Sequence, residues 1–381
     1  MRMTSTPRGF ARAILLGSGI RTPKRYLTTA TEKPVIPQVV FSGIQPTGTP
    51  HLGNYLGLFL PFLKLQRSLP PGIPLYLSVV GLHAITLPQD PKTLAEDRMN
   101  MMASLMACGV DPQRTCLFFQ EEVPEHAELA WILNTLTSVG KLQRMTTWKS
   151  KIATKINASE DNVTQSDLRL GLLAYPVLQA ADVLLYKATQ VPVGEDQTQH
   201  LELTKGIAET FNRKYGPTFP IPKTMIVPSK RILNLRDPSQ KMSKSSPNPL
   251  SRITILDPPQ TILSNLKAAV TDSLPGVTYD PISRPGVSNL LTIWSALDPS
   301  NRTPEQLVEE CGEWGLGKLK EHVGEVIVES LKGIKEEYER IRSADGFLRS
   351  VAKDGREWAG EVAKVTMKEV KQKVGLGPLD E

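Results

Sequence analysis

The sequence predicts an α/β fold with a doubly wound parallel sheet, followed by an all-helical C-terminal domain. Short apolar runs alternate with helical patterns as far as Arg213, and this alternation is typical of a parallel sheet covered on both faces. A loop rich in glycine and proline follows the first apolar run. After Pro258 the strand pattern ends, and helical periodicity continues to the end of the chain.

The individual elements are predicted from local periodicity. Strands are expected at Val39–Ser42, Leu75–Val80 and Cys116–Gln120. Pro176 is expected near the start of its helix, where a missing N–H group is tolerated. The polar, aperiodic residues 150–168 are expected to form a surface insertion. Helices are expected at Leu52–Ser68, Leu94–Cys108, Ala127–Val139, Ala174–Lys187, Asp196–Arg213, Ile262–Val270, Val287–Ala296, Pro304–Glu310, Lys318–Lys332, Lys335–Arg342 and Phe347–Val374.

The composition argues against several classes of protein. Hydrophobic residues make up 40% of the chain and charged residues 22%, which is typical of a soluble globular protein. No stretch approaches the roughly 18 apolar residues of a membrane span, so we expect no membrane association. The three cysteines form no CxxC pair, so neither a disulfide framework nor a metal site is predicted.

The first 31 residues differ from the rest of the chain. They contain six arginine and lysine residues and no acidic residue before Glu32, and the formal net charge of the whole chain is also +6. They are also rich in serine and threonine and include a short apolar run at Ala11–Leu16. This composition is typical of a mitochondrial transit peptide, although a solvated basic tail is the alternative. We therefore predict a transit peptide at residues 1–34 and a place in the mitochondrial matrix.

The loop Phe41–Asn54 has the residue types of a phosphate-binding turn. It joins a predicted strand to a predicted helix, the position at which doubly wound sheets bind nucleotides. His51 and Asn54 can donate hydrogen bonds to phosphate oxygens, and Gly53 allows a ligand to approach the backbone closely. Glycines and prolines also form ordinary tight turns, so this loop alone does not establish a phosphate-binding site.

A second candidate loop is Lys241–Ser245. Two lysines and two hydroxyl side chains within five residues form a cationic loop that can fold over a triphosphate. Two lysines in isolation would more often belong to a solvated basic loop.

Together, the two loops resemble the paired HIGH-like and KMSKS motifs of class I aminoacyl-tRNA synthetases. The first motif has the shortened form His51-Leu52-Gly53-Asn54, and the second is a full match at Lys241–Ser245. Three longer strings resemble the tryptophanyl-tRNA synthetase family: Phe41–Gly48, Leu173–Asp182 and Val191–Gln197. The resemblance implies a Rossmann-type catalytic domain at 35–250, with a mobile lysine loop at 241–245, and a helical tRNA anticodon-binding domain at 251–381.

The same resemblance implies a tryptophan pocket. Asp182 would accept a hydrogen bond from the indole N–H. On a helix, Tyr175, Gln179 and Asp182 are four and three residues apart and therefore share one face. In the absence of the resemblance, local capping by Asp182 and a core position for Tyr175 would be preferred. The implied tryptophan-binding residues are Asp182, Tyr175, Phe41, His83, Gln179, Val191, Val193 and Gln197.

The resemblance also implies an ATP site and the reaction that takes place there. Tryptophan would be activated with ATP, which brings Mg²⁺ with it as substrate, and would then be transferred to the 3′ end of tRNA(Trp). No resident metal is predicted. The residues expected to act in catalysis are His51, Asn54, Lys241 and Lys244. The residues expected to contact ATP are Gln45, Pro46, Thr47, Gly53, Asn54, Gly194, Glu195, Asp196, Ile232, Lys241, Met242, Ser243, Lys244 and Ser245.

Two positions depart from the family pattern. The residue two before His83 is commonly aspartate in the family and is Gly81 here, so Gly81 receives no role. The residue after the lysine motif is also commonly aspartate and is Ser246 here. Lysines of the helical domain are candidates for phosphate contacts with tRNA: Lys318, Lys320, Lys368, Lys371 and Lys373.

Other functions remain open at this point. A tyrosyl-tRNA synthetase shares the fold and both motifs. An inactive homologue acting as an RNA-binding or splicing partner would have no physical need for Lys241–Ser245 and Asp182. A nucleotidylyltransferase of the HxGH type would lack the second lysine motif. The resemblance also implies a homodimer.

Overall fold

The computed structural model describes residues 37–145, 148, 152, 168–194, 197–226, 231–244, 246–344 and 346–379. Residues 36–381 form one compact unit. The predicted transit peptide at 1–34, most of the predicted insertion 150–168, and the predicted ATP contacts Glu195, Asp196 and Ser245 lie outside the described residues, as does the side chain of Val193.

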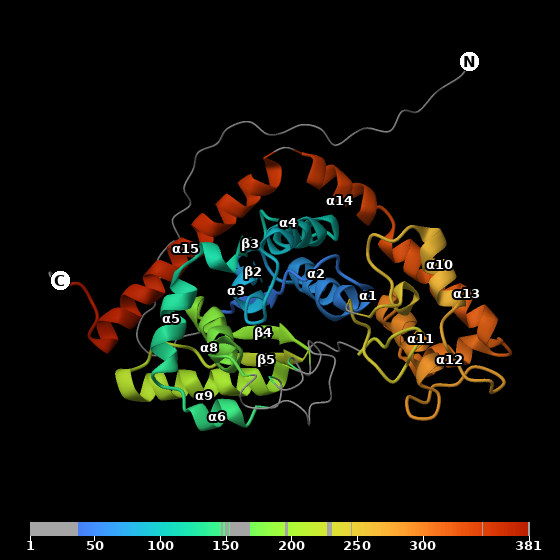
Figure 1. Cartoon of the computed structure of the whole chain (residues 1–381), viewed down its shortest axis with the longest axis horizontal. Coiled ribbons are helices and arrows are strands. Elements are labelled where there is room, and N and C mark those ends of the chain that lie inside the picture. The colour runs from blue at the N-terminus through green and yellow to red at the C-terminus, as the bar shows by residue number, and fades with distance from the viewer. Residues whose placement is uncertain are drawn as a thin grey trace, which may run out of the picture. The chain divides into compact units, whose positions relative to one another are not determined.

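A five-stranded sheet forms the centre of this unit (Figure 1), with the strand order β3-β2-β1-β4-β5 and every neighbouring pair parallel. The order reverses beside β1, which is the arrangement of a doubly wound, Rossmann-type sheet. The predicted α/β class is therefore confirmed. The strands are β1 Val40–Ile44, β2 Leu75–Val79, β3 Cys116–Phe119, β4 Gln190–Val193 and β5 Lys223–Ile226.

Alternate strand residues pack into two different layers, as a sheet covered on both faces requires. Val40, Leu77 and Leu117 belong to a core cluster with the apolar side chains of α2 and α4. Phe41 and Phe118 belong to a second cluster with α5, α8 and α9. The helices of this part are α1 Leu52–Asn54, α2 Leu60–Ser68, α3 Gly81–Ala84, α4 Pro91–Ala107, α5 Glu125–Asn134, α6 Val139–Gln143, α8 Leu170–Leu185 and α9 Thr198–Tyr215.

Two of these helices differ from the prediction in an informative way. The predicted helix Leu52–Ser68 is continuous, but its middle section, η1 Tyr55–Phe59, is a π-helix. The helix α8 begins at Leu170, so Pro176 lies inside it and the placement near its start was wrong. An internal proline removes one backbone hydrogen bond from a helix, and Pro176 is buried inside α8.

The C-terminal part is helical, as predicted: α10 Pro259–Lys267, α11 Pro285–Leu297, α12 Pro304–Cys311, α13 Leu316–Leu331, α14 Ile334–Ser343 and α15 Phe347–Val374. Figure 1 shows α14 beside α4, and α15 running past β3 and α5. A Cβ atom at Gly355 would lie 1.9 Å from the backbone oxygen of Leu117, so α15 reaches the sheet at its closest point only because residue 355 is glycine. The division of the chain at residue 250 stays a prediction.

Within the part of the chain that the structure describes, no helix combines the length and apolarity needed to cross a membrane.

Candidate active site

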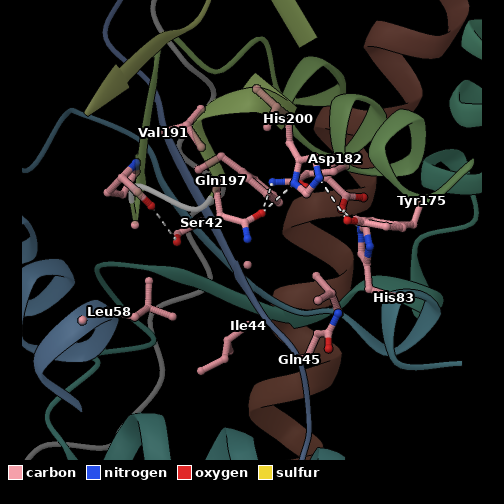
Figure 2. A pocket seen from close by; sticks show the side chains of 18 of the residues that line it. Ser42, Ile44, Gln45, Leu58, His83, Tyr175, Asp182, Val191, Gln197 and His200 are labelled. Atoms are coloured by element: carbon pink, nitrogen blue, oxygen red, sulfur yellow. Dashed lines mark hydrogen bonds and ion pairs between the residues drawn. The ribbon is translucent and has the colours of Figure 1, made fainter. Parts of the chain in front are cut away.

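A cavity of about 380 Å³ opens at the carboxyl ends of β1 and β4 (Figure 2), where the strand order of the sheet reverses. Ligands of doubly wound folds bind at this point because the connections from neighbouring strands turn to opposite faces of the sheet there. β1 and β4 are aligned only through Val40 and Gln190, at their amino ends. The cavity lies beyond this pair and takes lining residues from both strands.

The cavity collects residues that the sequence placed in two different subsites. Its lining includes the predicted residues Phe41, Gln45, Asn54, His83, Tyr175, Gln179, Asp182, Val191, Gly194 and Gln197. Tyr175, Gln179 and Asp182 line it together, so the predicted shared face of their helix is confirmed. The other described candidates, namely Pro46, Thr47, His51, Gly53, Ile232, Lys241, Met242, Ser243 and Lys244, are not among the residues of its wall.

Asp182 is the centre of a buried hydrogen-bond network at one side of the cavity. Its Oδ2 atom lies 2.8 Å from Nε2 of His83. Its Oδ1 atom lies 2.6 Å from Nδ1 of His126 and accepts a hydrogen bond of 2.7 Å from the amide of Gln120. The other nitrogen of His126 lies 2.8 Å from the hydroxyl of Tyr186. Asp182 is only 2% exposed, so this carboxylate is fixed in position by donors from three separate elements.

The pKa of Asp182 shows that these donors overcome the cost of burial. Burial alone raises the pKa of a carboxyl group, because the charged form loses its hydration. The hydrogen bonds from His126 and His83 and the attraction of their rings act in the opposite direction. They lower the pKa of Asp182 from 3.8 to about 2. The carboxylate is therefore ionised at neutral pH and remains an acceptor for a further donor.

A second group of polar side chains involves Tyr175 and Gln179, which lie on the same face of α8 as Asp182. The hydroxyl of Tyr175 lies 3.0 Å from Nε2 of His200, whose Nδ1 atom is 2.9 Å from Oε1 of Gln197. Gln179 donates to the same Gln197 oxygen at 3.4 Å. Figure 2 shows Asp182, His83 and Tyr175 together, on the side of the pocket away from Leu58.

His51 lies at the start of α1, in a loop held against a distant segment. Leu52 donates its N–H to the backbone oxygen of Ile253 at 2.8 Å, and Asn54 accepts from the His51 N–H at 3.1 Å. Burial, together with the charges of three basic side chains, Lys244, Lys241 and Arg252, lowers the pKa of His51 to about 4. The imidazole is therefore neutral at pH 7. Its Nδ1 is buried and finds no hydrogen-bond partner within the described ranges.

Gly53 and Ile232 are brought together beside this histidine. A Cβ atom at Gly53 would lie 2.9 Å from Cε1 of His51 and 3.7 Å from Cβ of Ile232. Glycine at this position therefore leaves the space that the His51 ring occupies. Met242 donates its N–H to the Ile232 oxygen at 2.9 Å, which attaches the lysine loop to the same region.

The two candidate loops, Phe41–Asn54 and Lys241–Ser245, are in direct contact through Lys244. The Lys244 ammonium donates to the backbone oxygen of Gly48 at 2.9 Å and to the hydroxyl of Thr47 at 3.2 Å. Burial lowers the pKa of Lys244 from 10.5 to about 8, and the charge of Asp97 partly opposes this shift. Lys241 begins the same loop and is exposed. Cationic and hydrogen-bond donor groups are therefore gathered at the loop whose Asn54 lines the cavity, and such groups bind a polyphosphate.

Several residues of the site were not found from the sequence. His126, Gln120 and Tyr186 hold Asp182 or its partner, and His200 holds Tyr175. The sequence offered only the residue types as a signal. That signal was too weak, because histidine, glutamine and tyrosine are also ordinary surface or core residues. Ser42, Ile44, Gly57, Leu58, Val80, Val183 and Pro192 also line the cavity without having been predicted.

Comparison with known proteins identifies the family. Residues 35–332 match the family described as tRNA synthetases class I (W and Y). The chain is 44% identical over 345 residues to the mitochondrial tryptophan–tRNA ligase of Saccharomyces cerevisiae, covering 88% of this chain and 90% of the relative. It is also 44% identical to the tryptophan–tRNA ligase of Caldanaerobacter subterraneus subsp. tengcongensis, covering 88% of this chain and 98% of the relative.

The chain belongs to the tryptophan–tRNA ligase family.

Solved structures of this family share its fold. The tryptophanyl-tRNA synthetase of Mycoplasma pneumoniae superposes with a TM-score of 0.77 at 33% identity, covering 90% of this chain and 99% of that one. The enzyme of Campylobacter jejuni, solved with ADP and tryptophan, has a TM-score of 0.70 at 28% identity and covers 89% of this chain and 100% of that one. The chain is therefore an aminoacyl-tRNA synthetase with a Rossmann-type catalytic fold.

Proposed function

We propose that this chain activates L-tryptophan with ATP and transfers it to the 3′ end of tRNA(Trp). The observation that carries the proposal is the buried, ionised Asp182 in a cavity at the switch point of the sheet. Asn54 of the first motif lines the same cavity, and Lys244 of the second motif contacts the loop that precedes it. A cavity with Phe41 and Val191 in its wall and a fixed, ionised acceptor at Asp182 suits a flat aromatic ring that carries a single N–H donor.

Tryptophan binding is proposed to use the acceptor capacity that Asp182 retains. An ionised carboxylate offers about four lone-pair positions. His83, His126 and Gln120 occupy three of them in this structure. The indole N–H would take the fourth, with Phe41 and Val191 against the ring. Tyr175, Gln179 and Gln197 would bind at the amino-acid end.

ATP would bind between the two motifs with Mg²⁺ as its companion ion. Gln45, Asn54 and Gly194 are on the cavity wall, where the nucleotide would meet the amino acid. Lys244 would exchange its present oxygen partners for phosphate oxygens. His51 is neutral and can still donate one hydrogen bond. Roles for Glu195, Asp196, Ser245 and the Val193 side chain stay predictions, because these groups lie outside the described part of the chain.

The first step is attack of the tryptophan carboxylate on the α-phosphorus, which forms tryptophanyl-adenylate and releases pyrophosphate. The nucleophile is already ionised, so this step needs no general base. The protein contributes by placing the two substrates in line and by stabilising negative charge on the phosphates. Lys241, Lys244, His51 and Asn54 are the groups we assign to that work. In the second step a ribose hydroxyl of the tRNA attacks the adenylate and AMP leaves.

The tRNA is proposed to contact the C-terminal helices. Three of the candidate lysines are engaged within the protein: Lys320 donates to the Ala269 oxygen at 2.8 Å, Lys371 pairs with Glu128 at 2.5 Å, and Lys373 pairs with Glu369 at 2.7 Å. Each would have to leave this partner to reach a phosphate. Lys318 is paired more loosely, at 3.5 Å to Glu321, and is the best placed of the four to do so.

We place the protein in the mitochondrial matrix. Two of the relatives, from Saccharomyces cerevisiae and Schizosaccharomyces pombe, are named as mitochondrial enzymes. The basic, acid-free residues 1–31 have the composition of an import signal. Residues 1–34 fused to a fluorescent protein should carry it to the matrix, and a cytosolic distribution would contradict the assignment.

A homodimer is also proposed. Trp131, Val139 and Leu170 are 74%, 57% and 78% exposed, and they lie on α5, α6 and α8, of which α8 contacts the other two. Large apolar side chains that are exposed in a single chain are typical of a protein interface.

The proposal for the reaction is tested by amino-acid-dependent ATP–pyrophosphate exchange. Tryptophan should support exchange, and tyrosine, which the same family description includes, should support it at least about a thousandfold less efficiently. Charging of tRNA(Trp) then tests the second step. Exchange that prefers tyrosine would overturn the choice of amino acid while leaving the adenylation chemistry in place.

A further inference from the structure

Gly81 is buried, and the space around it, not its backbone conformation, requires a glycine at this position. It begins α3, the short helix that carries His83, and its φ angle is not in the left-handed region. A Cβ atom at residue 81 would lie 2.4 Å from Oε2 and 2.7 Å from Cδ of Glu121. The carboxylate of Glu121 therefore occupies the space in which a side chain at position 81 would begin.

The turn that carries Glu121 holds the amino end of α3. Glu121 accepts a hydrogen bond of 3.2 Å from the Gly81 N–H, and Gln120 accepts one of 3.1 Å from the Leu82 N–H. The first N–H groups of a helix have no partners within the helix, so side-chain acceptors at this point stabilise it. The same Gln120 also donates to Asp182. One turn therefore connects the start of α3 to the carboxylate in the cavity.

Arg98 fixes Glu121 from the other side. Its guanidinium forms an ion pair with Glu121 and a longer one, of 3.5 Å, with Glu122. It also lies 4.5 Å from the centre of the Phe119 ring, which immobilises it further. Because Glu121 is held by Arg98 and by the Gly81 N–H together, its carboxylate cannot leave position 81 without losing both partners.

We propose that Glu121 is a positioning residue for tryptophan: it fills the space left by Gly81 and holds α3 so that His83 meets Asp182. The inference rests on the proposed function of Asp182 as the indole acceptor. Glu121 does not line the cavity, so its effect reaches the substrate through His83 and Asp182. Gly81 is one of the two positions that depart from the family pattern, and Glu121 is the side chain that occupies the space beside it.

The test combines substitutions at the two positions. Glu121→Ala removes the acceptor and should raise the Kd for tryptophan, measured by calorimetry, about tenfold. Gly81→Ala should have the same effect, because its methyl group expels the Glu121 carboxylate. The double variant should match either single variant, since there is only one carboxylate to lose. The Michaelis constant for ATP should stay within about twofold of the wild-type value in all three.

Glu122→Ala is the matched control. Glu122 belongs to the same turn and pairs with the same arginine, but within the described residues it forms no hydrogen bond or ion pair with α3. Its effect on tryptophan binding should therefore stay below about twofold. Effects of Glu121→Ala and Gly81→Ala that multiply in the double variant would overturn the proposal, as would equal effects of Glu121→Ala and Glu122→Ala.

Failure of the proposed function would be recognised separately. A wild-type protein without tryptophan-dependent exchange would contradict the function itself. The thermal unfolding midpoints of the two single variants and the double variant would still report whether positions 81 and 121 share one contact, because that contact exists without substrate.

Discussion

Lys244 keeps its ammonium group in a partly buried position, and this sets the pH range in which its charge is available. Its pKa is lowered by burial to about 8, so the free enzyme loses this charge as the pH rises through that value. We expect kcat/KM for ATP, which reports ionisation in the free enzyme, to fall above about pH 8. Lys244→Arg should remove this decline, because a guanidinium stays protonated.

Lys244→Ala provides the second half of that test. It should slow adenylate formation about a hundredfold at pH 7, as loss of one donor to developing charge does in other enzymes. The difference from the wild type should shrink above about pH 8, where the wild type loses the same charge. Tryptophan binding should change little, because Lys244 does not line the cavity. An arginine variant with an unchanged pH profile would show that another group controls the decline.

Asp182 should determine tryptophan binding without affecting ATP. Asp182→Asn keeps the shape of the side chain but removes the charge that His83 and His126 surround. We expect the Michaelis constant for tryptophan to rise about a hundredfold, in line with the loss of one partner from a buried charged pair. The Michaelis constant for ATP should stay within about twofold of the wild-type value. Equal losses for both substrates in steady-state exchange would indicate a purely structural role.

The same residue should make the free energy of unfolding depend on pH, and only in acid. The folded pKa of Asp182, about 2, is lower than the ordinary value of 3.8. Ionised Asp182 therefore stabilises the folded state above about pH 4, and this contribution is lost as the pH falls toward 2. In acid denaturation monitored by circular dichroism, the wild type should lose its advantage over Asp182→Asn across this interval.

At the scale of single residues, the sequence identifies side chains that carry a motif and misses those that only support them. His51, Lys244 and Asp182 were predicted because adjacent residues form recognisable strings. His126 lies 56 residues from Asp182 in the chain and Gln120 lies 62 residues away. Nothing in their local sequence indicates that the fold brings them to one carboxylate.

At the scale of elements, the missed strands have a physical explanation. β4 and β5 contain four residues each, β4 includes Pro192, and β5 begins with Lys223. Proline cannot donate to the sheet, and its presence usually indicates an edge strand. β4 is nevertheless internal, because it lies between β1 and β5. It tolerates Pro192 because it is aligned with β1 only at its first residue, Gln190. Periodicity identified β1, β2 and β3 because these strands are nearly continuous apolar runs buried on both faces.

The contact of α15 with β3 depends on one glycine. Gly355→Ala places a methyl group 1.9 Å from the Leu117 oxygen, so α15 must move away from the sheet. We expect the free energy of unfolding to fall by about 3 kcal/mol, at the upper end of the usual range for overpacking. Gly360→Ala is the control on the same helix, since nothing lies within 4 Å of its Cβ position. Because alanine favours helix, it should stabilise the protein by about 0.5 kcal/mol in the same urea titration. Equal effects of the two substitutions would show that the close approach has no energetic consequence.

At the scale of the whole molecule, one compact unit brings together segments that carry different parts of the reaction. The cavity takes residues from β1, α3, α8 and β4, and Lys244 contacts Gly48 of the first loop across 196 residues of chain. The sequence could indicate this assembly only through resemblance, because no local pattern encodes such distant contacts. The contacts inside the cavity do not show whether the surface of this unit binds a second copy of the chain, so this association is tested directly.

The proposed homodimer makes a specific prediction about α5. Trp131 is 74% exposed in the single chain, and burying it against a partner would remove a large apolar surface from water. Trp131→Glu places a charge at that position and should shift the protein from dimer to monomer in sedimentation velocity runs at micromolar concentration. Ile282→Glu makes the same kind of change at a residue that is 92% exposed and precedes α11, so it should leave the sedimentation coefficient unchanged. A Trp131→Glu protein that sediments like the wild type would place the interface elsewhere or make the protein a monomer. If the dimer forms through α5, α6 and α8, the loss of Trp131 should also reduce exchange activity, because α8 carries Asp182 and Tyr175 on its cavity face.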